Sequence, residues 1–124
     1  MRLEFLSSGA LECPLLRLFD FNLEEARQLF GVFEGLGSTG CRHIDLNGLP
    51  YIQGVNGCRL VLIHGEADLG IEETAEGFIC RLSGRAWREI AELTLPFCEP
   101  QARGYQWLTR SGDISLLLSV NGQW

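Results

Sequence analysis

His64, Glu66 and Asp68 are the residues in this chain with the clearest potential for chemistry. They alternate after an apolar run, so a strand continuing through them would place all three side chains on one face. An imidazole and two carboxylates in that arrangement could bind a divalent metal. The spacing matches no established metal motif, however, and Gly65 and Gly70 suggest that the strand has ended. We therefore keep the three residues as candidates for a binding surface and assign no metal ligand.

A second pair with chemical potential is Cys41 and His43, which would share one face of an extended strand. A cysteine and a histidine can act as nucleophile and general base. No third residue that could orient the pair is visible, and Cys41 follows Gly40 at the end of a loop. A turn explains the pattern more simply, so we predict no catalytic residue and no cofactor.

Aromatic residues with polar groups form a third set, because such side chains are common at interfaces. Tyr51 is retained as a candidate binding residue. Tyr105 and Trp107 would share one face of a strand, and that face could equally belong to the core. For Trp107 the core is the better prediction, since tryptophan is largely buried in most proteins.

The balance of charge argues against nucleic acid as a partner. The 124 residues include 16 acids and 10 bases, for a formal net charge of −6. The bases are scattered along the chain, whereas phosphate binding needs them clustered. No apolar run approaches the ~20 residues that span a bilayer, so we expect no membrane partner either.

The cysteines indicate a reducing compartment. There are five, an odd number, and no two have the C-x-x-C spacing of a zinc ribbon or a thioredoxin-like site. Free thiols are typical of the cytoplasm, which is where we expect the protein. A chain of this length usually forms one domain, and we predict a single domain over residues 1–124.

Two helices are predicted from apolar periodicity and capping residues. Asn22 and Glu25 form a capping-box pattern before a helix over 23–36, which Gly37 ends. Ser83 can cap a second helix, which Pro96 should stop near Leu95.

Strands account for most of the remaining chain. The asparagine–glycine pairs 47–48 and 56–57 predict hairpin turns between three of the strands. Residues 65–77 contain five acids and no base, which predicts a solvated loop. The expected strands are Leu15–Phe21, Arg42–Leu46, Tyr51–Val55, Cys58–His64, Gly77–Leu82, Tyr105–Arg110 and Ile114–Val120. We therefore predict an α+β fold, with a mainly antiparallel sheet of about six strands and both amphipathic helices packed on one face.

The second face of such a sheet should be polar if it meets water, but several apolar side chains point that way. If the strands are neighbours, these side chains form one stripe, and a two-fold dimer is the commonest way to cover it. The alternative is that the sheet curls and covers the stripe itself. The interface candidates are Val61, Ile63, Ile79, Leu108 and Leu117.

The sequence favours a binding module that acts through a protein or ligand surface, with a protein partner or a homodimer as the expected assembly. The alternative is a small enzyme or metal protein that uses His64, Glu66 and Asp68, or Cys41 and His43. A pocket that gathers these polar groups would favour chemistry, whereas dispersed groups would favour the binding module.

Overall fold

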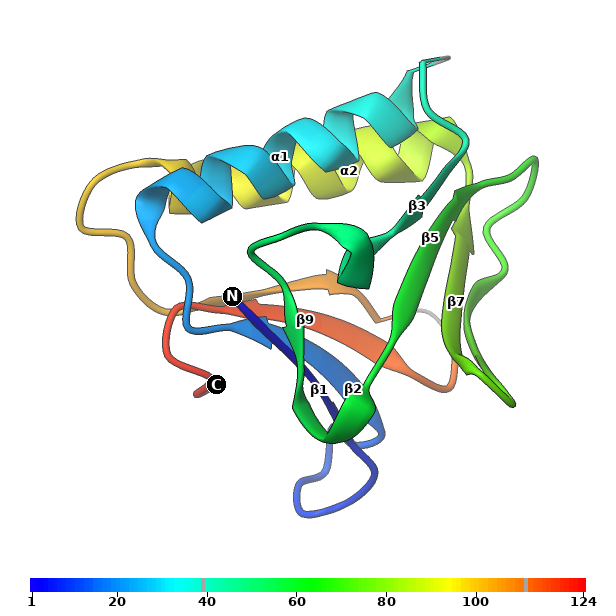
Figure 1. Ribbon diagram of the computed structural model, residues 1–124, viewed down its shortest axis with the longest axis horizontal. Coiled ribbons are helices and arrows are strands. Elements are labelled where there is room, and N and C mark those ends of the chain that lie inside the picture. Colours follow the sequence, from blue (N-terminus) through cyan, green and yellow to red (C-terminus); the bar gives the residue numbers. More distant parts are fainter. Residues whose placement is uncertain (39, 111) are drawn as a thin grey trace.

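A layer of two helices lies over a five-stranded sheet, and a four-stranded sheet stands at one end of both (Figure 1). This computed structural model describes residues 1–38, 40–110 and 112–124. Apolar side chains from both helices and both sheets meet in one core cluster.

The five-stranded sheet has the order β4-β1-β2-β9-β8. Strand β2 is parallel to β9, and β1 is parallel to β4, while the other two pairings are antiparallel. Its strands are β1 (Arg2–Leu6), β2 (Leu15–Phe19), β4 (Gln53–Gly54), β8 (Tyr105–Thr109) and β9 (Ser115–Ser119).

The four-stranded sheet has the order β3-β5-β7-β6. The central pair β5–β7 is parallel, and both outer pairings are antiparallel. Its strands are β3 (His43–Asp45), β5 (Leu60–His64), β6 (Gly70–Thr74) and β7 (Gly77–Leu82).

The α+β class is confirmed, but one mainly antiparallel sheet of about six strands is wrong. The reason lies in the two asparagine–glycine pairs, which fall in 3₁₀ turns, Leu46–Gly48 and Val55–Gly57, and join no hairpin. The side chain of Asn47 donates to the Cys58 carbonyl at 2.8 Å and accepts from the Leu60 N–H at 3.1 Å. These bonds hold the loop closed, so that β3 pairs with β5 while β4 crosses to the other sheet.

The sequence analysis also missed two strands, β1 and β6. Strand β6 lies inside the acidic segment that was expected to be a loop, and it pairs with β7 along its whole length. Ile71 is buried on one side of β6, and Glu72 forms an ion pair with Arg81 at 2.9 Å. The buried Ile71 and the Glu72–Arg81 ion pair thus help to hold a strand within a segment whose composition is mainly polar.

Both predicted helices are confirmed. Helix α1 spans Leu23–Gly37, and Asn22 and Glu25 form the complete capping box at its start. Helix α2 spans Gly84–Thr94, with the Ser83 hydroxyl accepting the Ala86 N–H. A 3₁₀ turn, Leu95–Cys98, follows it and contains Pro96, the residue predicted to stop the helix.

Candidate functional site

His64 ends β5 and binds the end of α1 instead of facing a ligand. Its Nδ1 lies 2.7 Å from the Leu36 carbonyl oxygen, and because a carbonyl can only accept, Nδ1 carries the hydrogen. This bond satisfies one of the carbonyls left free at a helix C-terminus. A side chain at Gly84, the first residue of α2, would meet the His64 ring at 3.0 Å. The histidine therefore fills the junction between the two helices and β5.

The carboxylates that alternate with His64 do not join it. Asp68 accepts the Ser83 N–H at 2.7 Å, just before α2. Hydrogen bonds from the Ser83 backbone and then from its side chain lower the pKa of Asp68. Glu66 is exposed. Within residues 1–38, 40–110 and 112–124, no three His, Cys, Asp or Glu side chains lie close enough together to hold a metal ion.

Cys41 and His43 are not brought together as a nucleophile and base. The Cys41 thiol donates to the main-chain carbonyl of His43, with 3.6 Å between sulfur and oxygen. The His43 side chain is exposed, while Cys41 packs against the core. The Cys41 thiol therefore stabilises a local turn, and the His43 side chain lies at the surface.

Tyr51 lies in the loop before β4. Its hydroxyl is buried and has no hydrogen-bond partner among the described residues. Burial and then the negative charge of Glu25 raise the pKa of Tyr51. Its carbonyl accepts the Met1 ammonium group at 2.9 Å, and Glu25 pairs with that same group. The surroundings of Tyr51 are therefore those of a residue that closes the core.

The five interface candidates do not form one stripe. Val61 and Ile63 on β5 and Ile79 on β7 are half-buried on the outer face of the four-stranded sheet, the face turned away from the core. Leu108 and Leu117 belong to the five-stranded sheet and are 5% and 0% exposed. The expectation of one stripe is wrong because β9 pairs with β2 and not with β7.

Trp107 also departs from the prediction, since it lies outside the core. It is half-buried on the outer face of the five-stranded sheet, where its ring meets Trp124 edge-on at 6.4 Å. The guanidinium of Arg110 lies 5.0 Å from the centre of the Trp107 ring. The side chain thus joins a surface cluster.

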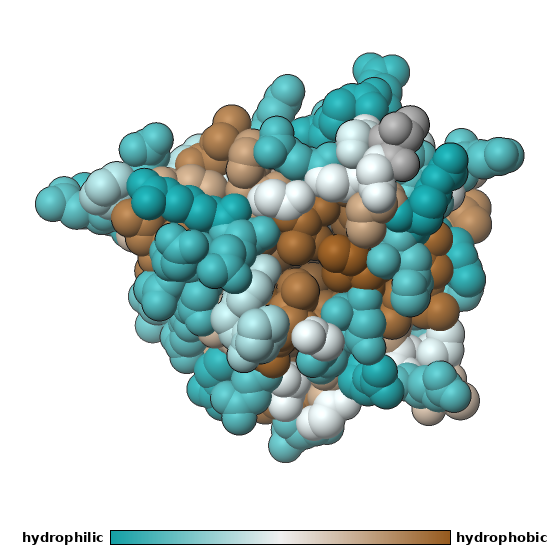
Figure 2. Space-filling view, turned by 45° about the horizontal axis from the view of Figure 1, so that its top comes forward, coloured by the Kyte–Doolittle hydropathy of each residue, from teal (hydrophilic) through white to brown (hydrophobic). Residues whose placement is uncertain are grey.

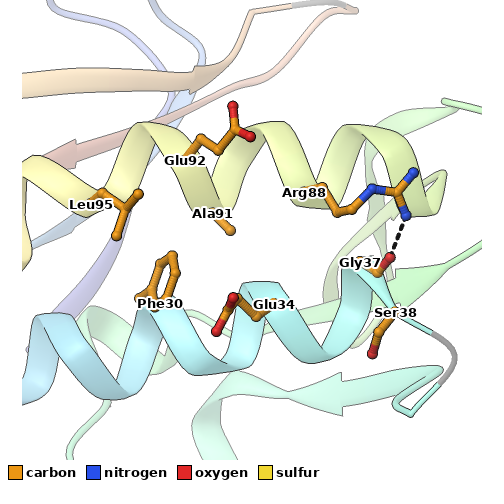
Figure 3. A pocket seen from close by; sticks show the side chains of 8 residues that line it. All are labelled: Phe30, Glu34, Gly37, Ser38, Arg88, Ala91, Glu92 and Leu95. Carbon is orange, nitrogen blue, oxygen red and sulfur yellow. Dashed lines mark hydrogen bonds between the residues drawn. The ribbon is translucent and has the colours of Figure 1, made fainter.

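A groove that joins apolar and charged groups lies between the two helices. It has a volume of about 360 Å³. Phe30 from α1 and Ala91 and Leu95 from the α2 segment form its apolar part. Glu34 lies on the α1 side, and Glu92 lies at the α2 rim with its carboxylate turned away from α1 (Figure 3). Where the molecule is turned to bring the helix layer forward, apolar side chains reach the surface among polar ones (Figure 2).

One end of this helix groove is closed by Arg88. Its guanidinium donates to the Gly37 carbonyl at 2.6 Å, across the end of α1. A cation there stabilises the negative end of the helix dipole. A Cβ on Gly37 would lie only 2.6 Å from the Arg88 side chain, which shows how closely the two helices approach at this point.

The groove carries a net negative charge, because the carboxylates of Glu34 and Glu92 outnumber the guanidinium of Arg88. Glu34 and Glu92 are exposed, and in the described part of the chain no ion pair or hydrogen bond engages either carboxylate. Leu95 is 46% exposed beside them. An apolar floor between two free carboxylates suits a ligand with an apolar stem and a cationic head, such as an arginine or lysine side chain.

Sequence reasoning did not find this site. Periodicity alone places Phe30 with the other apolar residues of α1 and Glu92 on the polar face of α2. Only the packing of one helix against the other brings the two residues to the same opening. The exposure of Leu95, at 46%, is likewise a property of the tertiary structure.

Comparison with known proteins finds no matching family model, and no curated protein or solved structure resembles the chain significantly. None of the helices in the described ranges has the length and apolar character needed to cross a membrane.

Proposed function

We propose that this protein is a binding module that holds a basic, apolar segment of a partner protein in the groove between α1 and α2. The observation that carries the proposal is the free pair Glu34 and Glu92 on either side of an apolar floor. Grooves with this combination receive amphipathic helices, whose apolar face enters the groove while charged residues meet its rim.

The dimensions of the groove support a short helix as the bound form. Helix α2 has 11 residues, which corresponds to roughly 16 Å, or about three turns. A partner helix lying along it would place two or three apolar side chains on Phe30, Ala91 and Leu95. Arginine or lysine one turn apart on that helix would reach Glu34 and Glu92.

The net charge of −6 supports a basic partner as well. A surface with excess negative charge accelerates encounter with a positive segment, and the acceleration falls as salt increases. The competing enzyme or metal protein receives no such support, because His64 is engaged by Leu36 and the Cys41 thiol by the His43 carbonyl.

The proposal can be tested with a synthetic 14-residue amphipathic helix that carries leucine on one face and arginine on the other. We expect it to shift the amide resonances of Gly37, Ala91 and Leu95 in the NMR spectrum of the full chain. The double variant Glu34→Gln/Glu92→Gln should weaken binding roughly 5- to 30-fold, as expected for two exposed ion pairs of about 0.5–1 kcal/mol each.

The matched control removes the same charge elsewhere. Glu66 and Glu76 are exposed and far from the groove lining, so Glu66→Gln/Glu76→Gln should change affinity less than twofold at 150 mM salt. Leu95→Ser should weaken binding without lowering the thermal midpoint, because this side chain is already half in water. The proposal fails if a peptide with glutamate in place of arginine binds equally well, or if the shifted resonances lie elsewhere.

A second surface supports self-association. Val61 pairs with Ile79 across β5 and β7, and Ile63 follows on the same face. The ion pairs Asp45–Arg59 and Glu72–Arg81 flank these three residues. An apolar centre with both signs of charge at its rim can match a second copy of itself about a two-fold axis. Light scattering at high micromolar concentration tests this, since a monomer there would exclude it.

A further inference from the structure

Strand β8 lies at the edge of the five-stranded sheet, with β9 on its only paired side. The Gly104 carbonyl accepts the Val120 N–H at 3.0 Å, toward β9. Because main-chain groups alternate in direction along a strand, those of Tyr105 and Trp107 face the open edge. The Trp107 carbonyl accepts the side-chain amide of Gln106 at 3.0 Å, so an added strand would have to displace that amide. The edge therefore offers the main-chain groups of Tyr105 and the N–H of Trp107 directly to an added strand.

A narrow groove runs beside this edge, between β8 and α2. It has a volume of about 190 Å³. Its apolar lining comes from Leu82 of β7, Leu108 of β8 and, on α2, Ala86, Ile90 and Leu93. Asp68 and Glu89 also line it, so it suits the apolar side chains of a bound segment and not its carboxylates. A strand added to β8 would turn every second side chain toward this lining.

The opposite face of β8 is aromatic and basic. Tyr105 is 49% exposed, and Trp107 is half-buried beside Trp124. Arg110 stacks on Trp107, a geometry that leaves the N–H edge of a guanidinium free for a carboxylate. In the described residues neither Arg110 nor Arg103 forms an ion pair, so a positive charge stands free at each end of β8.

The other open edges differ from β8. Strands β3 and β4 have three and two residues, too few to hold a partner strand. Strand β6 has five, but two of them are Glu72 and Glu73. Unpaired edge strands are usually protected against pairing with other chains by charged side chains or by distortion of the strand. The bulge between Trp107 and Thr109 is such a distortion. The charge at β8, however, attracts acidic segments.

We infer that β8 binds an extended acidic segment of a partner protein by strand addition. The segment alternates, with apolar side chains in the groove lined by Leu108 and Ile90 and with carboxylates at both ends, on Arg103 and Arg110. Two acidic residues that flank five paired residues lie six positions apart, so they share one face of the strand at a separation of about 20 Å. This interaction goes beyond the proposed helix groove, because it uses another surface and a partner of opposite charge.

The probe is a synthetic heptapeptide with aspartate at both ends, valine at positions 2, 4 and 6, and threonine at positions 3 and 5, so that the valines share one face and the aspartates the other. Binding should shift the amide resonances of Tyr105 and Trp107 and change the tryptophan fluorescence, since Trp107 lies at the surface whereas Trp87 is fully buried. The variant Arg103→Ala/Arg110→Ala should weaken binding about tenfold or more. Arg42→Ala, which removes an exposed arginine from another part of the chain, should leave it unchanged.

A second variant tests strand addition itself. Tyr105→Pro removes one outward N–H without removing a bond to β9, and edge strands tolerate proline. It should abolish binding while the spectrum of the core stays the same. The inference is overturned if a lysine-ended heptapeptide binds equally, if the acidic heptapeptide does not bind, or if an oligothymidine of eight nucleotides displaces it. A dimer that protects the β8 amides without peptide would also overturn it, since a second copy would then occupy the edge.

Discussion

The outer faces of both sheets carry apolar side chains, but these side chains are buried to different extents. On the five-stranded sheet, Leu117 is fully buried although it points away from the core. Its cross-strand neighbours are Arg17 and Trp107. The C-terminal segment covers this face, because Arg17 donates to the Gly122 carbonyl and stacks 4.2 Å from the centre of the Phe19 ring.

In the described part of the chain, no comparable segment covers the outer face of the four-stranded sheet. Val61, Ile63 and Ile79 stay half-buried, and their shelter comes from neighbouring charged side chains. Asp45 and Arg59 pair at 2.8 Å on one side. The comparison teaches that an apolar residue on an outer face belongs to the core only where another part of the chain returns over it.

The largest expected effect separates these two faces directly. Leu117→Asp would bury a charge without a partner, and we expect it to cost more than about 4 kcal/mol and leave the protein unfolded. Ile63→Asp places the same charge at a half-exposed position opposite Arg81 and should cost less than about 1.5 kcal/mol. Urea denaturation measures both. Equal losses would mean that the outer faces are equivalent, and the mass of folded Ile63→Asp by light scattering tests the self-association surface.

The covering segment itself can be disturbed at Gly122. This residue has φ of +87°, and an added Cβ would lie 3.0 Å from both Arg17 and Phe19. Gly122→Ala should therefore cost about 2–3 kcal/mol, from left-handed strain and from displaced neighbours. Gly112 has φ of +90° and open space around it, so Gly112→Ala measures the strain alone, about 1–2 kcal/mol. The thermal midpoint of Gly122→Ala should therefore lie below that of Gly112→Ala. Identical midpoints would mean that the C-terminal segment packs only loosely on the five-stranded sheet.

Alkaline pH tests the inner face of the four-stranded sheet. Burial raises the pKa of the Cys80 thiol from 9.0 to about 12. Above pH 9 the unfolded chain loses this proton while the folded chain keeps it, so folding stability falls by about 1.4 kcal/mol per pH unit until the folded thiol ionises. Below pH 9 the thiol contributes no pH dependence. The stability difference between wild type and Cys80→Ala, measured with reductant, should shrink between pH 9 and 11, and a constant difference would contradict the burial.

The smallest expected effect compares one arginine from each face. Arg17 binds both Glu4 and Gly122 and packs on Phe19, and its side chain is 21% exposed. Arg17→Met should cost about 1–2 kcal/mol, because Glu4 loses its partner and the cover loses an attachment. Arg59 pairs only with Asp45 and is 53% exposed, so Arg59→Met should cost less than about 0.5 kcal/mol. Chemical denaturation of both variants tests whether the ion pairs differ as their burial implies.

Helix capping was predictable because it depends on residues that are close in the sequence. Asn22 and Glu25 lie three positions apart and bond each other's main chain at 2.8 and 3.0 Å. At α2 the Ser83 hydroxyl accepts the Ala86 N–H, again from three positions along the chain. Apolar periodicity also located most of the core face of α1, since Ala26, Leu29, Phe33 and Leu36 are buried. Phe30 belongs to the same periodic set but is only partly buried.

The sheets were less predictable, because strand pairing depends on contacts between distant residues. The alternation in Ile114–Val120 identified β9, but the pattern contains nothing that selects β2 as its parallel neighbour. Asn47 was interpreted as a hairpin residue, and its side chain instead bonds Cys58 and Leu60, eleven and thirteen positions away. Local propensity favoured the turn, and those two longer-range hydrogen bonds decided it.

The candidate sites divide in the same way. The amino-acid sequence by itself determined the helices, their caps and the excess of acidic charge, because these depend on neighbouring residues or on composition alone. Only the tertiary structure decided that His64 serves the end of α1, that Glu34 and Glu92 face one groove, and that β8 is an open edge. Each of these follows from how elements far apart in the chain pack together, and the periodicity within a single element carries no information about that packing.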